Sequence, residues 1–239
     1  MQLYDMHSHI LPGIDDGASS VEKSLLILKE LKKQGVTNVC FTPHFYTNEI
    51  SANDFAVKRQ EAVDELMPHI PDGMKVVVGA EVYVSKYMFN GDDISCACYG
   101  NSPYILTEFA YTSSFSDNTM DYIVKLIENY NMIPILPHIE RYPALMSNPA
   151  LIAELKNMGV IIQTNTNSYT KKASFFLKHK LIKLIKGEFI DIIGSDAHSL
   201  HHNDPRTFSE AIDYISSKCG RDVVRRMMSN AEKIFNSAI

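Results

Sequence analysis

The chain of 239 residues is 45% hydrophobic, which is enough to bury one sizeable core, and no linker or low-complexity segment divides it. The formal net charge of −5, from 28 acidic and 23 basic side chains with no basic block, argues against a nucleic-acid-binding protein. No apolar run approaches the ~20 residues of a membrane span, and the start lacks a signal peptide. We therefore expect one cytoplasmic domain over residues 1–239 without membrane insertion.

Segments typical of strands and of amphipathic helices alternate along the chain. The first strand is expected at residues 2–6, and a helix capped by Ser20 runs to Gly35. A second strand at residues 36–42 is followed by an aromatic-rich loop, and residues 85–102 are expected to be irregular. The other predicted strands are residues 74–84, 104–109, 133–137, 160–164 and 190–194, and the other predicted helices are residues 53–67, 118–131, 149–158, 172–186, 207–219 and 221–238.

This alternation predicts an α/β fold with parallel strands. About seven strand–helix units suit a closed barrel better than an open sheet, and active sites of such barrels lie at the carboxyl ends of the strands. Histidines and acids follow the predicted strands at that end, namely His7, His9, His44, Glu81, Glu108, His138, Asp196 and His198. Their shared position predicts a site that holds several metal ions.

His7 and His9 stand two residues apart at the end of the first predicted strand. Because side chains alternate along a strand, both imidazoles should point the same way and offer two nitrogen ligands to one ion. A single pair of this kind is weak evidence, since histidines often lie hydrogen-bonded in a core. The ligand-type residues at the other strand ends are what make the pair informative.

Nitrogen and oxygen donors without thiolates favour manganese, iron, zinc or magnesium. With Asp16 included there are nine candidate ligands, too many for one tetrahedral zinc, and two or three ions that share a carboxylate would use them all. Paired ions ~3.5–4 Å apart are a common device for displacement at phosphorus, and a bound water whose pKa falls to ~7 supplies hydroxide at neutral pH. The donor set therefore indicates hydrolysis.

Several blocks resemble the polymerase-and-histidinol-phosphatase (PHP) superfamily, and within it the manganese-dependent protein-tyrosine phosphatases of bacterial capsule and exopolysaccharide operons. The blocks occur in the expected order and are His7-Ser8-His9, Gly13-Ile14-Asp15-Asp16-Gly17, Thr42-Pro43-His44, Gly79-Ala80-Glu81, Pro137-His138-Ile139-Glu140-Arg141-Tyr142 and Ser195-Asp196-Ala197-His198. The resemblance implies a single-domain distorted (β/α)7 barrel of the PHP type with three metal ions, manganese first and iron, zinc or magnesium as alternatives.

Carried over residue by residue, the resemblance implies three ligand sets. The first ion would be held by His7, His9, Glu81 and Asp196, the second by Glu81 as a bridge with Glu108 and His138, and the third by Asp16, His44 and His198. The pair Asp15-Asp16 leaves the choice of ligand open. We assign Asp16, with Asp15 behind a ligand or facing solvent.

The same resemblance suggests catalytic and substrate-binding residues. A guanidinium matches two phosphate oxygens, so Arg141 and Arg206 are the expected phosphate clamps, with surface ion pairs as the alternative, more so for Arg206. Phe45, Tyr46 and Tyr142 are candidates for a slot that takes the phosphotyrosine ring, and plain packing is as good an explanation.

Other polar residues have two readings. Asn165, Asn167 and Ser195 are expected either to orient ligands or to cap loops.

Cys219 and Arg225 match the C-x5-R spacing of cysteine-dependent tyrosine phosphatases. That loop must join a strand to a helix so that backbone N–H groups converge on the phosphate. Here the preceding segment is helical in pattern, so we predict a helix–helix turn. All four cysteines are expected to be reduced thiols, because they follow no disulfide or zinc-finger spacing.

The sequence thus predicts a metal-dependent phosphomonoesterase that dephosphorylates protein phosphotyrosine without a cysteine nucleophile. The resemblance suggests as partner the tail of a bacterial tyrosine kinase that controls capsular or extracellular polysaccharide synthesis; the oligomeric state is left open. A small-molecule phosphatase of the histidinol-phosphatase type is the alternative enzyme. An amidohydrolase is disfavoured because no lysine stands at a strand end, and a binding module without turnover because every ligand position is filled.

Overall fold

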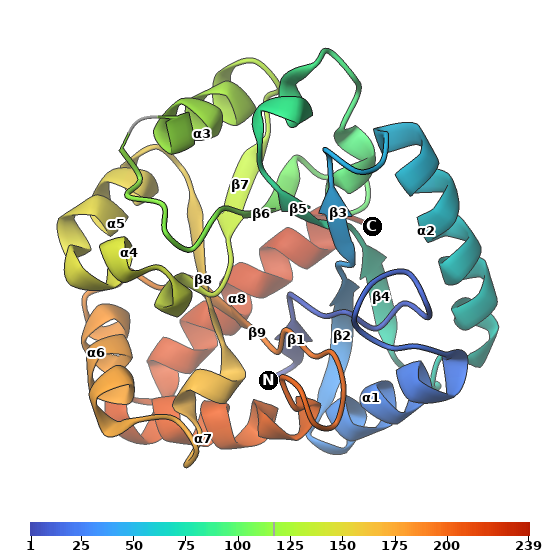
Figure 1. The fold of residues 1–239 in the computed structure, drawn as a ribbon. Helices are drawn as coiled ribbons and strands as arrows, with labels where there is room; N and C mark the ends of the chain where they lie inside the picture. The colour runs from blue at the N-terminus through green and yellow to red at the C-terminus, as the bar shows by residue number, and fades with distance from the viewer. Residues whose placement is uncertain (117) are drawn as a thin grey trace.

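A computed structural model describes residues 1–116 and 118–239 as an α/β fold in which every strand pair is parallel. Figure 1 shows short strands in the middle of the molecule with helices around them. The strands are β1 Leu3–Asp5, β2 Val36–Phe41, β3 His44–Tyr46, β4 Lys75–Val78, β5 Glu81–Tyr83, β6 Tyr104–Glu108, β7 Ile133–Leu136, β8 Ile161–Asn165 and β9 Ile192–Gly194. The predicted α/β class with parallel strands is confirmed.

The helices begin where the sequence offers caps. Ser20, Ser51 and Ser174 each accept a hydrogen bond from the backbone N–H three residues later, which satisfies one otherwise unpaired donor of the helix that follows. The helices are α1 Val21–Lys33, α2 Ala52–Leu66, α3 Asn118–Glu128, α4 Pro143–Ser147, α5 Pro149–Asn157, α6 Phe175–Lys186, α7 Phe208–Cys219 and α8 Arg221–Ser237.

The described strands form two hydrogen-bonded sheets, in the orders β1-β2-β4 and β3-β5-β6-β7-β8-β9, and not the one continuous ring that the prediction of a closed barrel implied. The sheets meet at both sides. Ser8, just after β1, bridges to Ala197 after β9, and on the other side only Thr42 and Pro43 separate β2 of the first sheet from β3 of the second. The carboxyl ends of β1 and β9 therefore lie side by side.

Two local predictions were wrong. The single strand expected at residues 74–84 is two strands, β4 and β5, separated at Gly79 and Ala80. A Cβ atom at Gly79 would lie 2.5 Å from a ring carbon of Tyr99, so the backbone passes directly over that ring. The loop expected after β2 contains the short strand β3, which pairs with β5 and brings His44 opposite Glu81.

Helix α8 covers the amino-terminal side of the sheet junction. It contacts β1 and β9, and in Figure 1 it runs behind the strands. Phe235 of α8 packs its ring edge against Tyr4 of β1 at a centroid distance of 5.5 Å, and both rings are buried. This packing anchors β1, from which the His7-Ser8-His9 segment emerges.

The C-x5-R segment lies at the junction of the last two helices. Helix α7 ends at Cys219 and α8 begins at Arg221, so the C-x5-R segment is a helix–helix turn as predicted. All four cysteines are free thiols. Within the described residues, no helix combines the length and the apolar character needed to cross a bilayer.

Candidate metal centre

The predicted ligands come together where the two sheets meet. His7 and His9 follow β1, Glu108 ends β6, and His138 stands two residues after β7. Asp196 and His198 follow β9, while His44 and Glu81 open the additional strands β3 and β5. All except Asp16 and His44 are buried, so the cluster sits in a pit rather than on the surface.

Glu81 is the centre of this cluster. Its Oε2 lies 3.2 Å from His7 Nε2, 3.2 Å from His9 Nε2 and 3.2 Å from His44 Nδ1. Its Oε1 lies 2.8 Å from His138 Nε2. Four imidazoles therefore face one buried carboxylate, which is the position that a bridging ligand between ions would occupy.

Asp196 presents one oxygen to the imidazoles and the other to donors. Its Oδ1 lies 3.3 Å from His9 Nε2, whereas its Oδ2 accepts hydrogen bonds from Arg141 at 2.6 Å and from the side-chain amides of Asn165 and Asn203 at 2.8 Å each. These three donors fix the carboxylate and leave Oδ1 to face His9. Asn165 thus orients a candidate ligand, which was one of its two predicted roles.

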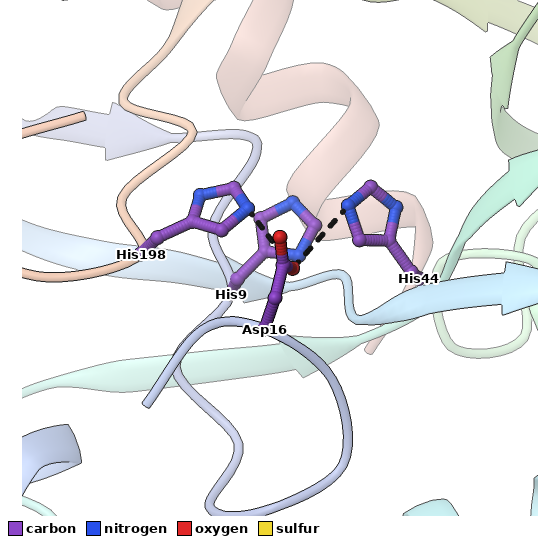
Figure 2. Close-up of side chains that lie close together, drawn as sticks. All are labelled: His9, Asp16, His44 and His198. Carbon is purple, nitrogen blue, oxygen red and sulfur yellow. Dashed lines mark ion pairs between the residues drawn. The ribbon is translucent and has the colours of Figure 1, made fainter. Parts of the chain in front are cut away.

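Asp16 forms a second group with His44 and His198, shown with His9 in Figure 2. Its Oδ1 lies 3.4 Å from His198 Nε2 and 3.6 Å from His44 Nε2, and its side chain is 70% exposed. The rings of His9 and His198 stack at 4.0 Å between centroids. Asp16 therefore closes the solvent side of this group.

Asp15 has a different position from its neighbour. Its carboxylate is 4% exposed, accepts a hydrogen bond from His9 Nδ1 at 2.8 Å, and accepts another from the backbone N–H of His44 at 2.9 Å. Burial raises the pKa of Asp15, but the bonds from His9 outweigh this effect and lower it to about 2. Asp15 does not face solvent; it stands behind His9 and orients its ring.

Several ligand-type atoms of the cluster lie close enough together to share an ion. His44 Nδ1 is buried beside Glu81 yet has no hydrogen-bond partner, because the directions of the two groups do not match. The Nε2 atoms of His7 and His9 lie 3.1 Å apart, within hydrogen-bonding distance of each other, and each lies 3.2 Å from Glu81 Oε2. Ligand atoms within 4.8 Å of one another form three groups, which are His9, Asp16, His44 and His198; His7, His9, Glu81 and Asp196; and His44, Glu81 and Glu108.

The electrostatics of the pit suit cations. Burial lowers the pKa of His138, and burial together with His9 lowers that of His198 to about 4, which leaves neutral rings with a free lone pair. Burial raises the pKa of Glu81, but His7 and the neighbouring imidazoles overcome it and hold the pKa well below its usual range. Burial lowers the pKa of His7 and His9, but the carboxylates around them outweigh burial and raise both, so these two rings favour a bound cation, a proton or a metal ion. Imidazoles bind metal ions in the neutral form and carboxylates in the ionised form, so a metal ion would displace these protons. The donor set therefore fits divalent cations.

Two candidate ligands have unusual backbone geometry. His138 has φ 36° and Asp196 has φ 52°, in the left-handed region that non-glycine residues rarely adopt. Gln163 supports the first of these by accepting the His138 N–H at 3.3 Å, and Ser195 is tied to Asp5 through its N–H and its hydroxyl. These supports aim the side chains inward. Ser195 acts here on the loop, and Asn167 binds Asn203.

A cavity of about 820 Å³ opens above the cluster. Its lining includes Asp16, His44, Glu108, Asp196 and His198, together with Arg141. Three tyrosines, Tyr46, Tyr83 and Tyr111, also line it. Of these only Tyr46 was predicted; Tyr111 could have been found because it follows Glu108 by three residues in the loop after β6.

Glu108, Tyr111 and Arg141 form a connected chain on the cavity wall. Burial and the charge of Glu81 raise the pKa of Glu108 to about 7. The Tyr111 hydroxyl donates to Glu108 Oε1 at 2.5 Å and accepts from Arg141 at 3.1 Å. Arg141 is one third exposed, with its other amino group on Asp196. Tyr111 thus holds the guanidinium at the edge of the pit.

Two aromatic residues predicted to contact the substrate lie elsewhere. Phe45 is buried and stacks on Phe55 at 4.3 Å, because alternation along β3 turns it away from His44 and Tyr46. Tyr142 is fully buried behind His138, where its hydroxyl accepts the N–H of Phe109 at 3.0 Å. For these two rings packing is the correct reading, and the structure gives them no place in a substrate slot.

Arg206 does not line the cavity either. Its Nε lies 2.8 Å from Asp204 Oδ1, its Nη2 lies 2.7 Å from Asp204 Oδ2 and 3.0 Å from the carbonyl oxygen of Leu200, and its side chain is 51% exposed. In this structure it forms the surface ion pair that was the alternative prediction. A phosphate-binding role would require the guanidinium to leave Asp204.

Known proteins resemble the chain over almost its whole length. It is 29% identical to the tyrosine-protein phosphatase CpsB of Streptococcus pneumoniae over 250 residues, covering 98% of both chains. It is 26% identical to the tyrosine-protein phosphatase YwqE of Bacillus subtilis, covering 98% of this chain and 92% of that one. Among solved structures, a chain from the work on YwqE of B. subtilis and CpsB of S. pneumoniae, described as unique metal-dependent tyrosine phosphatases, superposes with a TM-score of 0.81 at 22% identity and covers 99% of this chain and 96% of that chain.

The family comparison agrees with these likenesses. The model of the family described as capsular polysaccharide synthesis, CpsB/CapC, matches residues 3–236, a span that includes every candidate ligand. A match of that extent, together with the shared fold, identifies the family, and the chain therefore belongs to the CpsB/CapC family of capsular polysaccharide synthesis.

Proposed function

We propose that this chain is a metal-dependent phosphomonoesterase that hydrolyses phosphotyrosine in proteins, and that residues 1–239 act as one cytoplasmic phosphatase domain. The observation that carries the proposal is the cavity in which Tyr46, Tyr83 and Tyr111 stand around a floor of imidazoles and carboxylates. An aryl phosphate has an aromatic half for such walls and an anionic half for cations on such a floor. The names of the CpsB and YwqE relatives support the same activity.

We infer three divalent ions, with manganese as the first choice and iron, zinc or magnesium as alternatives. His7, His9, Glu81 and Asp196 would hold one, Glu81 with Glu108 and His138 a second, and Asp16, His44 and His198 a third. The short distance between His138 Nε2 and Glu81 Oε1, 2.8 Å, supports the second set. Bound divalent ions would neutralise phosphate charge and lower the pKa of water toward neutrality.

The protein's own groups would place the substrate for that chemistry. Arg141 lies at the cavity edge, where each of its amino groups donates one hydrogen bond, to Tyr111 and to Asp196, and the second N–H of each would bind a phosphate oxygen. Tyr46 and Tyr83, whose ring centroids lie 6.0 Å apart, would form one wall for the phenyl ring to pack against. The leaving phenolate, with a pKa near ~10, needs little proton donation. No residue has to form a covalent bond to phosphorus.

We also propose the biological setting that the family name suggests. The partner would be a phosphotyrosine protein, specifically the tail of a bacterial tyrosine kinase that controls capsular or extracellular polysaccharide synthesis. The family description supports the capsule context.

The proposal is tested with the purified chain and three substrates: a phosphotyrosyl peptide, a phosphoseryl peptide and histidinol phosphate. We expect the highest kcat/KM for phosphotyrosine, loss of turnover after dialysis against a chelator, and recovery with Mn²⁺. Cys219→Ser is the matched control and should keep full activity, because that thiol lies at a helix–helix turn. Faster turnover of histidinol phosphate, or activity that survives chelation but not Cys219→Ser, would overturn the proposal.

Tyr111→Phe tests how the phosphate clamp is held. Loss of the hydroxyl removes the bond to Glu108 at 2.5 Å and the bond from Arg141 at 3.1 Å. We expect kcat/KM for the phosphotyrosyl peptide to fall roughly tenfold, about 1.4 kcal/mol, through KM more than through kcat, because Arg141 is less well placed for binding. Tyr87→Phe, an exposed tyrosine outside the cavity, should change neither constant. An unchanged KM in Tyr111→Phe would remove its positioning role.

A further inference from the structure

The outward face of α6 carries two exposed aromatic rings among lysines. Phe175 is 72% exposed and Phe176 is 84% exposed, whereas the other nine of the 11 phenylalanines are buried or partly buried. Their rings lie 6.0 Å apart between centroids. Exposed rings of this size, adjacent to each other, are unusual on a surface that meets only water.

The same face is strongly basic. Helical spacing places Phe175, His179, Lys183 and Lys186 on one stripe, and the Phe175 and His179 rings stack at 6.1 Å. Lys171 and Lys172 precede the helix, and residues 171–187 contain no acidic residue. We call Lys171, Lys172, Phe175, Phe176, His179, Lys183 and Lys186 the α6 patch.

The charges of the α6 patch are not neutralised within the protein. None of its lysines has a carboxylate within 4.0 Å among the described residues, whereas Lys33 and Lys156 elsewhere do pair with acids. The chain as a whole carries −5, so this basic face is a local exception. A surface with this composition attracts a partner that carries a high density of negative charge and also has an apolar region for the two rings.

The shape of the α6 patch favours a flat partner. Five cavities of the described part of the chain are lined by residues outside the α6 patch. The opposite side of α6 is already buried, through Leu181, Ile182, Leu184 and Ile185. α6 therefore lies at the edge of the fold (Figure 1), with its apolar side covered and its two exposed rings facing outward.

We propose that the α6 patch docks the protein onto an anionic membrane surface. The lysines would lie at the headgroups, and the rings of Phe175 and Phe176 would enter the boundary between headgroups and acyl chains without spanning the bilayer. A second copy of the chain is a poor occupant, because a twofold interface would place one basic stripe against another. The proposal is independent of the metal-centre chemistry.

Docking in this way has a geometric result for the catalytic face. The short connection of residues 166–174 leads from the end of β8 to the first turn of α6, and Asn165 at the end of β8 binds Asp196 of the metal centre. The two rings thus lie at the same end of the fold as the cavity. A protein substrate anchored at the membrane would be presented close to that opening.

Vesicle sedimentation tests the proposal with the full purified chain. We expect binding to phosphatidylcholine vesicles that contain about 30% phosphatidylglycerol, no binding to pure phosphatidylcholine, and weaker binding as salt rises above ~0.1 M, where screening shortens the reach of charges. The double variant Phe175→Ser/Phe176→Ser should lower the partition coefficient at least about tenfold. Lys183→Glu/Lys186→Glu should abolish it.

Matched controls keep the test specific. Val57→Ser/Met67→Ser removes two exposed apolar side chains elsewhere, and Lys29→Glu/Lys75→Glu makes the same change in charge on other surfaces. Both should bind vesicles like the wild type, and all four variants should keep the unfolding temperature and soluble phosphatase activity of the wild type. Absence of binding to anionic vesicles, or wild-type binding by the double phenylalanine variant, would overturn the proposal. The proposal would also be overturned if light scattering showed a dimer for the wild type and a monomer for the double phenylalanine variant, because the rings would then lie in an interface between two copies of the chain.

Discussion

Glu81→Gln is expected to lower kcat/KM for phosphotyrosyl peptide at least about a thousandfold, which corresponds to ~4 kcal/mol of lost transition-state stabilisation. The physical reason is the position of one carboxylate with four imidazole nitrogens within 3.2 Å of its oxygens. An amide has the same shape, but it carries no charge and can offer only one acceptor atom to two cations. Metal content measured by elemental analysis should fall together with activity.

The matched control for this substitution is Glu65→Gln on the exposed face of α2. It makes the same chemical change far from any candidate ligand and should leave both metal content and turnover at the wild-type level. A folded Glu81→Gln protein with full activity and full metal content would show that the cluster is not built around this residue. Circular dichroism and the unfolding temperature distinguish a specific loss of metal and activity in Glu81→Gln from loss of the fold.

Arg141→Ala is expected to lower kcat/KM by about a hundredfold to a thousandfold, because the substrate phosphate loses a charged two-point hydrogen-bond partner. Arg141→Lys should restore only part of this loss, since an ammonium group cannot match two oxygens at once. Steady-state kinetics with an aryl phosphate measure both effects. Arg225→Ala, which removes an exposed arginine paired with Asp222, should be silent.

Arg206→Ala separates the two arginines that were predicted from the sequence. Held by Asp204 outside the cavity, Arg206 should contribute much less than Arg141. If both alanine variants lose activity equally, the loop that carries Arg206 must rearrange when substrate binds. If Arg141→Ala alone is unimpaired, the proposed clamp is wrong.

Much of the candidate metal centre could be predicted because the ends of strands can be recognised in the sequence. Apolar runs such as the one ending before His138 fix where a side chain emerges, and parallel strands bring these points together without further information. The alternation rule would also have shown that Phe45 faces away from its neighbours in β3. That strand was missed because three residues are too few to show a period.

The residues that the sequence did not reveal depend on tertiary distance. Tyr142 was a candidate for the substrate slot because it follows His138 closely in the sequence, but the turn after His138 directs its ring into the core. Tyr111 lies in a loop whose path no periodicity describes. Arg206 has a local partner two residues earlier, Asp204, and only the folded loop decides between that partner and a substrate. The break between β4 and β5 likewise lies where the backbone at Gly79 passes close to the ring of Tyr99, a contact between residues 20 apart in the sequence.

The left-handed backbone of His138 and Asp196 limits how this protein could be improved for other uses. A residue in this conformation lowers the free energy of unfolding by ~1–2 kcal/mol relative to an unstrained residue. Glycine or asparagine would adopt the same backbone conformation with a smaller loss of stability. A library selected only for thermal stability would therefore tend to replace these two residues. The stable variants obtained would have lost activity, and the selection would not detect that loss. Engineering a more stable variant therefore requires a screen that measures catalytic activity and thermal stability together.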